Sequence, residues 1–207
     1  MQQDEDGPGG LVVVQPKGPS YPVLDVVKAV KHPGYDEYRA WADRVSKAAA
    51  ASGRRFRPIP AFDVAILYVD HPEQLGPPLE IAGRDTLMAL TQGEPIMLLG
   101  YPSEGLIGTD IFRPEPTAQQ GLVTSITTYF FYRGDDIDNQ LVQHSAPSAG
   151  GSSGSPMFNA DGKVVAFANA GNNAAVETRD GARVPSAALV NYAMRADTLL
   201  DLIEGKA

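Results

Sequence analysis

The stretch Gly150-Gly151-Ser152-Ser153-Gly154-Ser155-Pro156 carries three glycines and three serines between two apolar runs. Glycine takes positive φ values readily and lets a substrate approach the backbone closely. A tight turn of this kind can aim two backbone N–H groups at one point, and such fixed donors stabilise the charge that develops on an attacked carbonyl. Composition alone would fit a plain hairpin turn equally well, so the order of the residues has to decide.

The chain continues with Met157-Phe158-Asn159, a turn at Asp161-Gly162 and an apolar strand over residues 163–167. This order resembles the nucleophile region of trypsin/chymotrypsin-like serine endopeptidases, and it is most similar to their disulfide-free bacterial branch, with its pattern Gly-x-Ser-Gly-(Gly/Ser)-Pro. Matched position by position, the resemblance implies that Ser153 is the nucleophile. It also implies that the N–H groups of Gly151 and Ser153 form the oxyanion hole.

A competing motif is present, because residues 150–154 also fit Gly-x-Ser-x-Gly, the nucleophile elbow of α/β-hydrolases, with Ser152 as the nucleophile. That elbow leads directly into a helix and needs a catalytic histidine later in the chain. Pro156 and a hairpin pattern follow here, and no histidine lies beyond His144. The α/β-hydrolase interpretation is therefore rejected.

Asp63 opens the apolar run of residues 62–69. A carboxylate leading into such a run is expected to be partly buried, and a buried carboxylate needs partners; the alternative is an ordinary turn residue at a strand entrance. In the family that the chain resembles, a His-Pro-x-Tyr segment precedes the strand that carries the catalytic Asp. Residues 32–35 and Asp63 reproduce this order, so the resemblance implies that Asp63 is the acid of the catalytic triad.

The sequence offers no clear candidate for the general base that would activate Ser153. A serine hydroxyl is a poor nucleophile until a neighbouring base removes its proton. The chain has three histidines, but His32 belongs to the His-Pro-x-Tyr segment, His71 follows the Asp63 strand and His144 lies in a strand before the nucleophile. In the family the catalytic histidine precedes the Asp, and no residue before Asp63 matches it.

Two hypotheses account for the missing histidine. The first is that the catalytic histidine lies upstream of this chain, on a segment that also completes the first barrel; residues 1–70 supply only about three strands, and an open remnant would expose sheet edges. The second is a catalytically inactive relative that binds peptides or proteins. The joint presence of Asp63, Gly151, Ser153 and Gly154 favours the first.

Composition narrows the possible partners. The 207-residue chain has a formal net charge of −8, which argues against nucleic acid and anionic membranes as partners. No apolar run approaches the roughly 20 residues of a membrane span. The first seven residues are polar and acidic, unlike a signal peptide. Localisation is therefore unknown from the residues, although the resemblance implies a secreted or periplasmic protein.

The resemblance implies an all-β fold with two antiparallel six-stranded barrels, the first incomplete in this chain, and an active site between them. Residues 1–10 are expected to be disordered. Residues 11–93 would form the partial first barrel, with strands at 11–15 and 21–30, an inserted helix at about 36–52 capped by Asp36, and a connecting loop at 71–93. Residues 94–207 would form the second barrel and end in a helix at about 197–204. Its six expected strands lie at residues 95–101, 121–131, 140–145, 156–159, 163–170 and 182–192.

The implied reaction is peptide hydrolysis through an acyl-enzyme, without cofactor or metal. By resemblance, the substrate-binding residues are Pro147, Ser148, Asn169, Ala170 and Gly171. Pro147 stands where family members that cleave after Arg or Lys carry an Asp. The expected P1 residue, the one on the amino side of the cleaved bond, is therefore uncharged and small to medium in size.

Overall fold

The structure is a computed structural model that describes residues 12–14, 22–54, 58–102, 116–171, 175–177, 183–185 and 190–207. The expected disordered segment at residues 1–10 lies outside the described residues.

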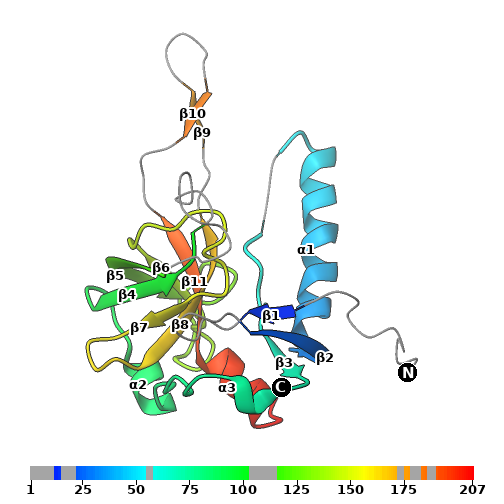
Figure 1. Ribbon diagram of the computed structural model, residues 1–207. Coiled ribbons are helices and arrows are strands. Elements are labelled where there is room, and N and C mark those ends of the chain that lie inside the picture. Colours follow the sequence, from blue (N-terminus) through cyan, green and yellow to red (C-terminus); the bar gives the residue numbers. More distant parts are fainter. Residues whose placement is uncertain are drawn as a thin grey trace.

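Six antiparallel strands form a closed barrel, which occupies one side of the molecule (Figure 1). In spatial order they are β11 (Asn191–Arg195), β6 (Leu141–His144), β5 (Thr117–Thr127), β4 (Pro95–Gly100), β7 (Pro156–Phe158) and β8 (Val164–Gly171), and β8 pairs with β11 to close the ring. Closure leaves no strand edge unpaired in the barrel. The all-β fold class, with one closed barrel and one partial sheet, is confirmed.

The barrel interior is filled by apolar side chains that point inward from alternating strand positions. Leu98, Val123, Val142, Met157 and Val165 are all buried there. Residues of the expected connecting loop also join this core, because Ala82 and Leu87 are completely buried against it. The segment 71–93 is therefore more than a surface loop: it contains the short helices η1 (Pro72–Gln74) and α2 (Arg84–Ala89).

Gly121 lets β5 cross closely over the chain that leaves β6. A Cβ atom at this position would lie 2.2 Å from the backbone nitrogen of Ala146. No side chain fits in that space, so only glycine allows the crossing. The crossing fixes the start of residues 146–149, which lead into the turn that carries Ser153.

A three-stranded sheet lies beside the barrel, with the order β1 (Val12–Val14), β2 (Val23–Lys31) and β3 (Ala65–Val69). Figure 1 shows this sheet and helix α1 (Gly34–Ala51) on the opposite side of the molecule from β4 and β5. Several large apolar side chains of the sheet face solvent, among them Val23, Val27, Leu67 and Tyr68. Within the described residues the sheet is open.

Helix α1 was expected at residues 36–52 with Asp36 as its N-cap, and that cap assignment is wrong. The helix begins at Gly34, its N-cap is Pro33, and no side chain caps it. Asp36 lies instead in the first turn, where its carboxylate forms an ion pair with Lys31 at 2.8 Å. The helix ends at Ala51, followed by Gly53 at a φ of +70°, which is a conformation that ends helices.

A second apolar cluster joins the two halves of the molecule. Tyr38 of α1 and Ala61 pack with Tyr129, Leu141 and Met194 of the barrel side, and all five are buried. Phe62 lies partly buried against the same cluster. The segment just before β3 is therefore held against the barrel.

The last expected strand, residues 182–192, is divided in the structure. A small hairpin of β9 (Ala175–Glu177) and β10 (Arg183–Pro185) projects away from the barrel (Figure 1), and β11 begins only at Asn191. The C-terminal helix α3 spans Asp197–Ile203, close to the expected bounds. Among the helices of the described ranges, none is long and apolar enough to cross a membrane.

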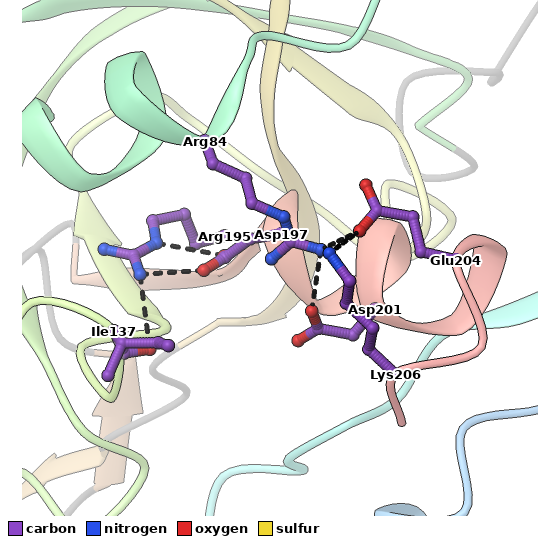
Figure 2. Close-up of polar contacts among 7 residues, drawn as sticks. All are labelled: Arg84, Ile137, Arg195, Asp197, Asp201, Glu204 and Lys206. Atoms are coloured by element: carbon purple, nitrogen blue, oxygen red, sulfur yellow. Dashed lines mark hydrogen bonds and ion pairs between the residues drawn. The ribbon is translucent and has the colours of Figure 1, made fainter.

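A buried ion pair fastens α3 to the barrel (Figure 2). The guanidinium of Arg195, at the end of β11, donates to both carboxylate oxygens of Asp197, at 3.0 and 2.8 Å. It also donates to the backbone carbonyl of Asp136 at 2.7 Å. Arg195 and Asp197 are 1% and 3% exposed, so this network is part of the protein interior.

Candidate functional site

The turn that carries Ser153 lies between β6 and β7 and depends on two glycines with positive φ, +89° at Gly151 and +81° at Gly154. Ala149 and Ser152 close the first half of the turn reciprocally. The Ser152 N–H donates to the Ala149 carbonyl at 3.0 Å, and the Ala149 N–H donates to Ser152 Oγ at 3.2 Å. The Gly154 N–H fastens the other half to the carbonyl of Ala168 on β8, at 2.7 Å.

Two N–H groups of this turn make no hydrogen bond with the described part of the chain. The N–H groups of Ser152, Gly154 and Ser155 are all used within the turn or by β8. Those of Gly151 and Ser153 have no such acceptor. They are the two that the sequence assigned to the oxyanion hole, and they are available to a ligand.

The two candidate nucleophiles differ in exposure. Ser152 is 3% exposed, and its oxygen accepts the hydrogen bond that closes the turn. Ser153 is exposed, and its hydroxyl donates to the carbonyl of Asn169 at 3.4 Å. Of the two, only Ser153 Oγ can be reached by a substrate from solvent.

A cavity of about 270 Å³ lies directly beside Ser153. No charged side chain lines it. Its walls come from the turn and from the end of β8: Ser148, Ala149, Gly150, Ser152, Ser153, Ala168, Asn169, Ala170 and Gly171. Four of the five expected substrate-binding residues are therefore brought together here. The fifth, Pro147, is exposed and does not line the cavity.

Asp63 lies just before β3, on the segment that packs against the barrel. Its backbone N–H contacts the Met194 sulfur of β11 at 3.1 Å. We expected a partly buried carboxylate, but Asp63 is exposed. Neighbouring protein atoms still displace enough water to raise the pKa of this carboxyl above its ordinary value.

None of the three histidines forms a hydrogen bond with Ser153, whose hydroxyl donates to the Asn169 carbonyl instead. His32 is buried and stacked on Phe62 at 4.9 Å, and burial lowers its pKa. His71 is exposed and bonded to Glu73 at 3.2 Å. His144 is completely buried in β6, and burial lowers its pKa to about 4, although the backbone of Tyr192 and Ala146 acts in the opposite direction.

A family model described as a trypsin-like peptidase domain matches residues 42–167, more than half of the chain. The chain belongs to this family. The matched range contains both Asp63 and the Ser153 turn, and it ends within β8. No curated protein matches the chain.

Two solved structures are similar to the chain, and the first of them supports the fold assignment. A Glu endopeptidase in complex with MPD is 18% identical to the chain, with a TM-score of 0.54; the match covers 89% of this chain and 65% of that one. The inactive form of Rv3671c from M. tuberculosis, a serine-to-alanine mutant, is 20% identical with a TM-score of 0.45, over 69% of this chain and 58% of that one. The chain thus spans about 65% of the length of the first neighbour.

Sequence reasoning missed how the trypsin-like site is joined to the first sheet. The Asn169 side chain donates from Nδ2 to the carbonyl of Pro60 at 2.8 Å, although Asn169 was expected only as a substrate-binding residue. Met194, which contacts the Asp63 N–H, was not singled out at all. No local pattern signals these contacts, because the partners are 109 and 131 residues apart in the chain.

Proposed function

We propose that this chain is the peptide-hydrolysing part of a serine endopeptidase and reacts through an acyl-enzyme on Ser153. The observation that carries the proposal is the pair of unused N–H groups, on Gly151 and Ser153, beside the exposed Ser153 hydroxyl. Fixed donors of this kind act on the charge that develops in the transition state, where they accelerate acyl transfer.

The reaction has two halves. Ser153 Oγ attacks the carbonyl carbon of the peptide bond as a base takes its proton, and the two N–H groups hold the oxyanion. The base then protonates the leaving amine, and water hydrolyses the resulting ester. Asp63 would orient that base. None of the three histidines is placed to act, so the proposal assigns the base to a histidine outside residues 1–207.

A catalytically inactive, peptide-binding domain is the second candidate. It is favoured by the state of the histidines, because two of them are buried and the third is bonded to Glu73. Such a domain would use the cavity and the free N–H groups to hold a peptide without cutting it.

Labelling with a fluorophosphonate distinguishes the two candidates, because this probe reacts only with activated serines. The purified chain is treated with the probe alone and with excess imidazole as an added base, and the adduct is located by intact mass and peptide mapping. We expect an adduct on Ser153 in the presence of imidazole. The Ser153→Ala variant should abolish it, whereas the Ser152→Ala variant should still be labelled on Ser153, more slowly because the Ala149 N–H loses its acceptor in the turn.

An adduct on Ser152, or no adduct under either condition in a folded protein, would overturn the proposal. The second result would favour the peptide-binding domain. Labelling without imidazole would mean that one of the three histidines serves as the base after all.

The uncharged cavity bears on substrate choice. Its lining offers no carboxylate to an Arg or Lys side chain, and burying an unpaired charge is costly. Peptidyl phosphonates with Ala, Val or Leu at P1 should therefore label Ser153 at least tenfold faster than matched probes with Arg or Lys at P1. Equal rates, or faster labelling by the Arg probe, would contradict this assignment of the cavity to P1.

A further inference from the structure

Asn169 lies at a break in the regular pairing of β8 with β11. Tyr192 pairs with Ala170 and Ala193 pairs with Ala168, so Asn169 opposes no residue of β11. This is a β-bulge, a feature that re-aims the side chain of the extra residue and releases its backbone groups from the ladder.

The bulge gives Asn169 two contacts on two different segments. Its carbonyl accepts the hydrogen bond from Ser153 Oγ, and its side-chain amide donates to the Pro60 carbonyl at 2.8 Å. Pro60 stands three residues before Asp63. One residue therefore connects the candidate nucleophile with the segment that carries the candidate acid.

The segment from Pro60 to Val64 has a conformation that it would not adopt unaided. Phe62 has a φ of +55°, a left-handed value that is an outlier for a bulky residue and costs free energy. Its ring packs on Tyr129 at 5.1 Å and on His32 at 4.9 Å. Asn169 supplies a side-chain hydrogen bond to this segment, in addition to the contact of the Asp63 N–H with Met194 and the bond of the His32 N–H to the Val64 carbonyl.

One atom of the Asn169 side chain is energetically unfavourable. Its Oδ1 atom is buried and has no hydrogen-bond partner among the described residues, and a buried unsatisfied acceptor is unfavourable. An alanine here would avoid that cost but would also lose the bond to Pro60. The hydrogen bond to Pro60 can offset the free-energy cost of the unpaired Oδ1 atom.

We propose that Asn169 is a positioning residue that fixes the segment carrying Asp63 relative to Ser153. This inference rests on the proposed function for the parts assigned to Asp63 and Ser153. It adds a second role to a residue that also lines the cavity beside Ser153, because its side-chain amide is bonded to Pro60.

The test compares Asn169→Ala with a matched variant, Asn191→Ala. Asn191 lies on the adjacent strand β11, and its amide makes the same kind of bond, to the Ala146 carbonyl at 2.9 Å. Within the described part of the chain, that amide makes no hydrogen bond to residues 60–64. The titration of Asp63 is followed by carboxyl ¹³C NMR, and exchange of the Val64 amide, which donates to Phe62, is measured at neutral pH.

In the Asn169→Ala protein we expect the Asp63 pKa to fall to the ordinary value, because the released segment regains water. Exchange of the Val64 amide should be about tenfold faster, the change expected from losing one hydrogen bond. The Asn191→Ala protein should retain the raised Asp63 pKa even if its melting temperature falls. If Asn169 contributes only to stability, the Asn169→Ala protein will be less stable, as the Asn191→Ala protein is, but will keep the raised Asp63 pKa. That result would overturn the proposal.

These readouts do not require Ser153 to react. If Asp63 is released in the Asn169→Ala protein but Ser153 of the parent chain is never labelled, the proposed hydrolysis fails and the positioning of Asp63 stands. If Ser153 is labelled and the Asn169→Ala variant leaves both readouts unchanged, the proposed hydrolysis stands and this inference fails.

Discussion

Replacing Asp197 by alanine should lower the free energy of unfolding by about 3–5 kcal/mol, since it removes one partner of a buried ion pair and leaves the other uncompensated. The Arg195 guanidinium would lose both oxygens of Asp197 and keep its bonds to the carbonyls of the segment before β6. The start of α3 would also be destabilised, because this pair joins the first residue of the helix to the end of β11 (Figure 2).

The measurement is urea unfolding at pH 7, and the matched control is Asp36→Ala. Asp36 forms an ion pair of similar length with Lys31, but both side chains are largely exposed, and such pairs contribute about 1 kcal/mol or less. Replacing both buried partners together, as Arg195→Met with Asp197→Leu, should recover part of the loss, because no charge then stays unpaired. A loss for Asp197→Ala as small as that of the control would contradict the prediction.

Stability should also fall steeply between pH 6.5 and 4, because His144 is buried in its neutral form. Burial lowers the pKa of His144 from 6.5 to about 4. Above pH 6.5 both the folded and the unfolded chain hold this ring neutral, so it adds no pH dependence. Below pH 6.5 the unfolded chain binds a proton at this ring, whereas the folded chain does not bind it until about pH 4. The free energy of unfolding is therefore lower by roughly 3 kcal/mol at pH 4 than at pH 7.

Urea unfolding at several pH values between 7.5 and 4.5 measures this slope, and His144→Gln should flatten it. His32 acts in the same direction, since burial lowers its pKa too, so a smaller slope should remain. A His144→Gln protein that keeps the full slope would exclude His144 as its source.

Elements with strong local signals could be predicted well. The strand over residues 95–101 and the C-terminal helix are seen within one residue of their expected bounds, because their apolar periodicity agrees with their burial. The strand expected at residues 182–192 had the wrong bounds, because residues 183–185 pair with β9 in a separate hairpin and only the last two residues of the range belong to β11. The short helix α2 was missed because six residues carry too little periodicity to identify a helix.

Part of the candidate site could likewise be predicted from the sequence, and part could not. The sequence by itself determined the Ser153 turn, because the glycines mark where the backbone can take positive φ values. It also determined that the cavity is uncharged, because all the lining residues come from two short segments without charged side chains. Only the tertiary structure decided how Asp63 is attached. The bond of Asn169 to Pro60 and the contact of Met194 with the Asp63 N–H join residues 109 and 131 positions apart, and the bulge at Asn169 depends on the pairing of β8 with β11. Such contacts depend on how the barrel and the first sheet pack together, and no local pattern of residues encodes that packing.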